Sequence, residues 1–470
     1  MRSLSGGLLQ VSSSLLPVGG EIMTGTLLNN SDFHLNPREA GDPPSQLDFA
    51  PFTPCRPVVK ISRPYATFTT VCWPMSGRSP EDRRQYGSAR DGCPFSRGGD
   101  IIRAMAKQFV QILDPEGVVS DESDLPDLDS QKLVQLYRLM VLNRRVDERM
   151  ITLQRQGRIG FYVSSMGEEA AIIGSAAALQ DTDWIIPCYR ELGAALLRGF
   201  TIYELCCQLF GNKKDPNKGR QMPNHYALPH LRYASISSPV GTQIPHATGV
   251  ALGCKITGSR DAVLVYFGDG ATSTGDFHAA ANLAGTMKAP VVFLCRNNQW
   301  AISVPVERQT ASRSLAAKAQ AYGFEGVRVD GNDLLAVYKE TSAALGKARN
   351  GEGPTLIEAF TYRLEGHSTS DDPRAYREEE QVQAWKERDP LKRLQAYLTA
   401  TDVWSEKQER ELEAETRDRI LTAVRKAEAD GPPPLESLFT DVFDEVPWNL
   451  REQQEELERS LESSAVIQEV

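Results

Sequence analysis

The chain has 470 residues, 41% of them hydrophobic, and a formal net charge of −10 from 52 basic and 62 acidic side chains. These values are typical of a soluble globular protein with two or three domain-sized units. The net negative charge argues against binding to nucleic acid or to anionic membranes, since the sequence also has no marked cluster of Lys and Arg. No apolar run approaches the roughly 20 residues of a spanning helix, which excludes a membrane protein.

The first 104 residues predict a poorly ordered extension. Eleven of the 28 prolines lie there, among Ser, Gly and Arg, without sustained periodicity. The opening is rich in Ser and Leu, but acidic residues follow from Glu21 onward, unlike the acid-poor pattern of a mitochondrial presequence. We therefore expect a cytoplasmic protein, with the mitochondrial matrix as the alternative. Met105 is a candidate start of translation.

Residues 105–156 are expected to form an arm and a helix. From Ser130 onward, apolar residues repeat at three- and four-residue steps, and Asp129 or Ser130 can cap the helix.

Residues 157–400 predict an α/β domain, in which short apolar runs alternate with helical patterns. Buried strands separated by helices indicate a parallel sheet with helices on both faces. The expected strands cover residues 184–186, 263–267, 291–295, 327–329 and 355–361.

Residues 401–470 predict a charged, helical C-terminal tail. The pair Ser405 and Gln408 has capping-box form, and Gly431 with the prolines after it ends the helix that follows. A last acidic helix is expected over residues 451–461.

The eight cysteines show no Cys-x-x-Cys pair and no histidine pattern. The sequence therefore gives no reason to expect a zinc site or a redox-active dithiol. We expect reduced, non-catalytic thiols.

The most informative polar residues follow two of the predicted strands. Gly268-Asp269-Gly270 comes after the second strand, and Asn298 comes 29 residues beyond Asp269, at the end of the third. Since parallel strands deliver their carboxyl ends to one edge, Asp269 and Asn298 should meet there. Glycines allow backbone to approach a phosphate, Arg296 offers a cationic fork, and carboxylate and amide oxygens suit Mg²⁺. This pattern is typical of thiamine diphosphate binding.

Further distinctive segments are RQGRIGFY (155–162), GEE (167–169), KGRQMP (218–223), SSPVGTQ (237–243) and YRLEGHSTSDD (362–372). In these segments, and over roughly three quarters of its length from about residue 107 onward, the chain resembles the α subunit of the decarboxylating dehydrogenase component of branched-chain α-keto acid dehydrogenase complexes.

The resemblance implies a site residue by residue. The implied cofactor contacts are Tyr189, Arg190, Ser238, Val240, Gly268, Asp269, Gly270, Ala271, Arg296, Asn298 and His367. The implied magnesium ligands are Asp269, Asn298 and the carbonyl of Trp300, and an implied potassium loop comprises Ser237, Pro239, Thr242 and Gln243.

His367 matches the active-site histidine of this family, and an imidazole near neutral pH can exchange protons or hydrogen-bond phosphate. His225, His230, His246 and His278 are expected to serve packing or local hydrogen bonds. Ser368 aligns with a serine that is phosphorylated in mammalian relatives; here we expect an ordinary loop serine.

The implied activity is decarboxylation of branched-chain α-keto acids, followed by reductive acylation of a lipoyl group on a partner acyltransferase. In this family the glutamate that faces the aminopyrimidine belongs to a separate β subunit, and an α2β2 assembly is implied. Glu168 and Glu169 are interpreted as residues at the start of a helix. Two alternatives stay open. One is the α subunit of a pyruvate or acetoin dehydrogenase, and the other is a catalytically silent structural or regulatory homologue.

Overall fold

The computed structural model describes residues 109–468 of the chain. The expected N-terminal extension over residues 1–104 and the candidate start at Met105 therefore lie outside the described residues. The domain boundaries given above stay predictions.

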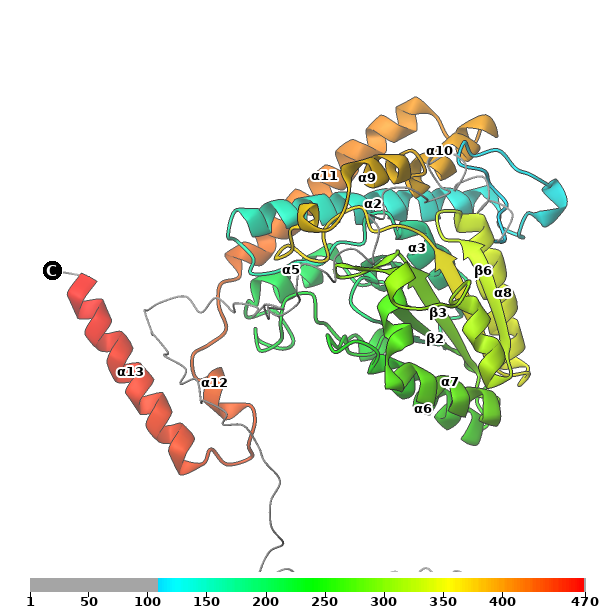
Figure 1. Ribbon diagram of the computed structural model, residues 1–470. Coiled ribbons are helices and arrows are strands. Elements are labelled where there is room, and N and C mark those ends of the chain that lie inside the picture. Colours follow the sequence, from blue (N-terminus) through cyan, green and yellow to red (C-terminus); the bar gives the residue numbers. More distant parts are fainter. Residues whose placement is uncertain (1–108, 469–470) are drawn as a thin grey trace, which may run out of the picture. The chain divides into compact units, whose positions relative to one another are not determined.

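A five-stranded parallel sheet forms the centre of the described part, in the order β1-β2-β3-β7-β6 (Figure 1). Each of the five runs expected to be strands is one, which confirms the α/β class. The strands are β1 (Trp184–Ile186), β2 (Val263–Gly268), β3 (Val291–Asn297), β6 (Glu325–Asp330) and β7 (Thr355–Phe360). Strand β3 extends beyond the predicted residue 295 because its last residue, Asn297, still pairs with Phe360 of β7.

Helices cover both faces of this sheet. Alternate side chains of β2 belong to separate cores: Val263, Val265 and Phe267 face one side, and Leu264 and Tyr266 the other. The helices on the first side are α6 (Gln243–Ile256) and α7 (Gly275–Met287), which lie together in Figure 1. Those on the second side are α2 (Ser130–Arg155), α3 (Glu169–Ala177), α4 (Leu192–Leu197), α5 (Ile202–Phe210) and α8 (Leu334–Arg349).

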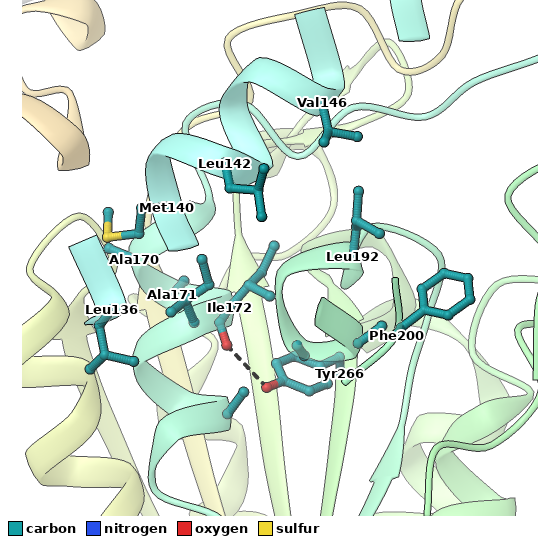
Figure 2. Packing of buried hydrophobic residues seen from close by; sticks show 14 of the residues in the cluster. Leu136, Met140, Leu142, Val146, Ala170, Ala171, Ile172, Leu192, Phe200 and Tyr266 are labelled. Atoms are coloured by element: carbon teal, nitrogen blue, oxygen red, sulfur yellow. Dashed lines mark hydrogen bonds between the residues drawn. The ribbon is translucent and has the colours of Figure 1, made fainter. Parts of the chain in front are cut away.

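Helix α2 begins at the predicted residue, Ser130. The side chain of Asp129 caps it by accepting a hydrogen bond from the Lys132 amide at 2.7 Å. Figure 2 shows its apolar face, including Leu136 and Met140, against the small residues of α3. Beneath α3, the Tyr266 hydroxyl of β2 donates to the carbonyl of Ile172 at 3.3 Å, so the helix is tied to the sheet below it.

The C-terminal part is helical, as expected. Its helices are α9 (Glu379–Lys386), α10 (Pro390–Ala400), α11 (Glu406–Ala429), α12 (Ser437–Thr440) and α13 (Trp448–Gln468). Ser405 caps α11, as its sequence position predicts. Helix α11 buries Leu412 and Ile420 in the same core as α2 and α5, so it is an integral layer of the fold.

Short elements complete the chain. They are η2 (Glu122–Asp124), η3 (Pro229–Leu231), η4 (Asp269–Ser273), β4 (Trp300–Ala301), β5 (Val304–Pro305), η5 (Val306–Arg308), η6 (Ala316–Tyr322) and η7 (Pro373–Ala375). Over residues 109–468, no helix has both the length and the apolar character needed to cross a membrane. The five cysteines of this part, at positions 188, 206, 207, 254 and 295, are all buried and form no disulfide.

A buried carboxylate, Asp333, ties the first described segment to the start of α8. One of its oxygens caps α8 by accepting from the amides of Leu335 and Ala336 at 3.0 and 3.2 Å. The other accepts from the amides of Ile112 and Leu113 at 2.6 and 2.7 Å. Four backbone donors therefore depend on one side chain that is fully buried.

We expect Asp333→Ala to lower the free energy of unfolding by about 3–5 kcal/mol, because it leaves buried amides without acceptors and removes a helix cap. Denaturant unfolding would measure this effect. The control is Asp129→Ala, which removes one exposed cap and should cost only about 1 kcal/mol. Equal losses in the two variants would contradict the role given to Asp333.

Candidate active site

The site lies where β2 and β3 end, at the carboxyl edge of the sheet. Gly268 pairs in register with Arg296, so Asp269 and Asn298 follow neighbouring strand ends, as the sequence predicts. A cavity of about 440 Å³ opens there. The predicted cofactor and magnesium residues all line it: Tyr189, Arg190, Ser238, Val240, Gly268, Asp269, Gly270, Ala271, Arg296, Asn298, Trp300 and His367.

Two buried carboxylates hold Arg296 at the floor of this cavity. Its Nη1 atom lies 2.5 Å from Glu168 Oε2, and its Nη2 atom pairs with Glu191. Arg190 is also close, with its Nε atom 3.9 Å from Glu168. Burial raises the pKa of Glu191, and the positive charge of Arg296 opposes that shift. The guanidinium of Arg296 is thereby fixed before any anion arrives.

Asp269 is only 1% exposed and begins the 3₁₀ turn η4. Burial raises its pKa to about 6, against the lowering effect of the hydrogen bond from Gln309. That bond joins Gln309 Nε2 to Asp269 Oδ2 at 2.5 Å. A cation would stabilise the ionised form of this carboxylate, because opposite charge offsets the cost of burial.

The other two predicted metal ligands are also held by neighbours. Asn298 donates from Nδ2 to Glu168 Oε1 at 2.8 Å, and its Oδ1 accepts from the Trp300 amide at 3.3 Å. The carbonyl of Trp300 accepts from Arg363 at 3.2 Å. Arg363 thus anchors the short β4–β5 hairpin beside the cavity, since it also donates to the carbonyl of Ile302 at 2.7 Å.

Arg190 holds His367 in the cavity wall. Its Nη2 donates to the carbonyl of His367 at 2.6 Å and lies 3.2 Å from Nδ1. Because a guanidinium can only donate, Nδ1 is the acceptor and Nε2 carries the proton. Burial, together with the positive charges of Arg190 and Arg363, lowers the pKa of His367 to about 3. The imidazole is therefore neutral at physiological pH.

The residues present fit a magnesium diphosphate group. Asp269, Asn298 and the Trp300 carbonyl offer the hard oxygens that Mg²⁺ prefers. A Cβ atom placed on Gly268 would meet no protein atom within 4 Å, so this glycine leaves open space. At Gly270 a Cβ would lie 2.7 Å from that of Ala301, so only glycine fits the turn. The buried Nε of Arg296 has no hydrogen-bond partner within residues 109–468.

The four residues of the expected potassium loop lie just outside this cavity lining. Ser237 Oγ is 3.2 Å from Thr242 Oγ1, which donates to the Pro239 carbonyl at 3.1 Å. Gln243 donates to the Tyr266 carbonyl at 2.9 Å, and its buried Oε1 has no partner in the described part of the chain. The loop thus presents several oxygens, one of them unpaired.

Several residues of the site were missed by the sequence analysis: Glu168, Glu191, His225, Gln309 and Arg363. His225 was expected to serve packing or a local bond; it lines the cavity, and its Nε2 is hydrogen-bonded to the hydroxyl of Ser238. Glu168 does stand at the start of α3, as expected, but its side chain turns into the site and does not cap the helix. The GEE segment was the one available signal for it.

The chain matches a family model and several known proteins over most of its length. The family model of the dehydrogenase E1 component matches residues 137–436. The chain is 45% identical to the mitochondrial 2-oxoisovalerate dehydrogenase subunit alpha 1 of Arabidopsis thaliana, over 73% of each chain. It is 42% identical to the human mitochondrial 2-oxoisovalerate dehydrogenase subunit alpha, over 82% of this chain and 89% of the relative. For the Dictyostelium discoideum subunit the identity is 44%, over 74% and 79%.

Proposed function

Because the chain belongs to the family of dehydrogenase E1 components, we propose that it is the α subunit of a branched-chain α-keto acid dehydrogenase. The observation that carries the proposal is its 41–45% identity, over most of its length, to α subunits of 2-oxoisovalerate dehydrogenases. The protein is an oxidoreductase component that decarboxylates branched-chain α-keto acids and passes the acyl group to a lipoyl carrier. Its cofactor is thiamine diphosphate.

When bound, thiamine diphosphate supplies the electron sink that decarboxylation of an α-keto acid requires. Arg190 and Arg296 hold the diphosphate, and Gly268, Gly270 and Ala271 admit it close to the backbone. Tyr189, Ser238 and Val240 line the same cavity. They hold the part of the cofactor other than its diphosphate. The lining of one cavity by all these residues supports this assignment.

Magnesium is bound by Asp269, Asn298 and the Trp300 carbonyl, which supply oxygen ligands from neighbouring strand ends. Potassium is bound by the loop of Ser237, Pro239, Thr242 and Gln243. The unpaired Oε1 of Gln243 supports the second site, because a buried oxygen without a donor gains from a cation.

His367 is the catalytic residue of this chain. Neutral and protonated on Nε2, its imidazole has a donor for the reacting group at that atom, while Arg190 contacts the ring at Nδ1. Its role is to stabilise the acyl group and move a proton during transfer to the lipoyl carrier. Arg190 therefore serves two functions, since it faces both the diphosphate and the imidazole.

The partners are a β subunit and a lipoyl-bearing acyltransferase, and the assembly is α2β2. The β subunit supplies the carboxylate that faces the aminopyrimidine. We propose a location in the mitochondrial matrix, because the relatives reported above are mitochondrial subunits. The cytoplasmic location preferred from the sequence is not supported by these relatives, and we do not retain it.

Substrate preference tests the proposal. We expect the assembled α and β chains to decarboxylate the keto acids derived from valine, leucine and isoleucine with a kcat/KM at least about tenfold above that for pyruvate, because a branched side chain fills an apolar pocket that pyruvate leaves partly empty. Steady-state rates with each keto acid provide the measurement. Preference for pyruvate or acetoin would favour the related dehydrogenases, and no activity with any of them would favour a silent homologue.

A further inference from the structure

One carboxylate, Glu168, connects the two halves of the proposed cofactor site. It is fully buried, and its two oxygens have different partners. Oε2 accepts from Arg296 at 2.5 Å, and Oε1 accepts from the side-chain amide of Asn298 at 2.8 Å. Arg296 faces the proposed diphosphate and Asn298 is a proposed magnesium ligand. A single side chain therefore orients both groups.

The contact with Glu168 also decides which end of the Asn298 amide is oxygen. An ionised carboxylate can only accept hydrogen bonds, so the Nδ2 end of Asn298 must face Glu168. Oδ1, the atom that a hard cation binds, is consequently the end directed away from Glu168. Such supporting contacts strongly influence metal affinity, because they hold the ligand in its binding orientation.

Glu191 provides an internal comparison. It is also fully buried and pairs with Arg296. Its second oxygen, however, accepts from the backbone amide of Cys188 at 2.9 Å. Glu191 therefore shares the charge and the arginine contact of Glu168 but, within residues 109–468, makes no hydrogen bond or ion pair with a proposed metal ligand.

The two glutamates carry the negative charge nearest to Arg296. Both pair with its guanidinium group, and Arg190 lies 3.9 Å from Glu168. Neutralising either glutamate removes one of these negative charges. In a buried site, this change strengthens attraction for a polyphosphate that arrives without metal.

We infer that Glu168 is a positioning residue that couples magnesium binding to diphosphate binding in this chain. The inference rests on the proposed function, because it assumes the cofactor and metal assigned above. Coupling of this kind is reciprocal: a bound metal raises affinity for the diphosphate, and a bound diphosphate raises affinity for the metal by the same factor.

The test is calorimetry on the full α chain assembled with its β subunit. Mg²⁺ is titrated in the presence of saturating thiamine diphosphate, and inorganic pyrophosphate is titrated without metal. The variants are Glu168→Gln, which removes the charge, and Glu168→Asp, which keeps the charge but shortens the reach. Glu191→Gln is the matched control, and circular dichroism verifies that each variant is folded.

We expect Glu168→Gln and Glu168→Asp to lower magnesium affinity roughly 10- to 100-fold, and Glu191→Gln to change it less than about threefold. Both Gln variants should bind metal-free pyrophosphate about threefold or more tightly, and Glu168→Asp should not. A merely structural role would not produce opposite changes for metal and anion.

Equal magnesium affinities for the Gln variants of Glu168 and Glu191 would overturn the inference alone. The proposed function would fail separately if the parent complex bound thiamine diphosphate without any dependence on magnesium. Should Glu168→Gln not fold, Glu168→Asp still decides the matter, because parental magnesium affinity in that variant contradicts the coupling role.

Discussion

Asp269→Ala is expected to reduce turnover roughly 1,000-fold, equivalent to several kcal/mol of lost transition-state stabilisation. The reason is that Asp269 is the only carboxylate among the proposed magnesium ligands, and it lies buried at the end of β2. Without it, a bound magnesium ion would lose its charged ligand, and binding of the proposed diphosphate would depend on Arg190 and Arg296. The fold should persist, because this side chain accepts a single side-chain hydrogen bond, from Gln309.

Calorimetry with thiamine diphosphate, with and without Mg²⁺, measures the effect directly. In the variant, affinity should no longer depend on the metal. Glu352→Ala is the control, since Glu352 is exposed and precedes β7 at the opposite end of the sheet from the site. A variant at Asp269 that retains parental, magnesium-dependent affinity would refute its assigned role.

His367→Ala is expected to lower the rate of lipoyl acylation about 10²- to 10⁴-fold while leaving cofactor affinity within a few-fold of the parent. The imidazole lies against Arg190 and edge-on to Tyr189, with ring centroids 5.9 Å apart. Its loss removes a hydrogen-bonding group from the cavity but no metal ligand. Parallel assays of cofactor binding and of transfer to a lipoyl acceptor separate the two effects.

His230→Ala is the matched control, because that histidine is exposed on η3. Unchanged lipoyl acylation in His367→Ala would disprove the catalytic assignment.

The stability of the protein should also depend on pH through His367. The pKa of this histidine in the folded chain, about 3, lies below its ordinary value of 6.5. Protons therefore bind preferentially to the unfolded chain between these values, and His367 makes the protein less stable as pH falls from about 6.5 toward 3.

The sheet could be predicted from the sequence because each strand is indicated by a short, local run of apolar residues. Residues 263–267 and 291–295 are short, continuous apolar runs of the kind found in strands covered on both faces, and all of these residues are buried. The meeting of Asp269 and Asn298 then follows from parallel strand direction alone. Caps such as Asp129 and Ser405 were equally accessible, because their partners lie three residues away.

The supporting residues of the site could not be predicted in this way. Glu168 is 130 residues from Asn298 in the sequence, and Arg363 is 63 residues from Trp300. No periodic pattern encodes such contacts, since they depend on how loops between distant elements pack. His225 does make the hydrogen bonds expected of it, to Pro223 and Ser238, but its place in the cavity lining could not be read from the sequence.

The packing of α11 on α2 can form only late in synthesis, because the two helices lie far apart in the sequence. Tyr137 in α2 donates to Glu409 in α11 at 2.9 Å across 272 residues. At roughly 5–20 residues per second, the ribosome needs roughly 15 to 55 s to make that interval. Until α11 emerges, the nascent chain exposes the apolar surface that Leu412 and Ile420 later cover. Transient exposure of apolar surface during synthesis generally favours aggregation, which chaperones limit.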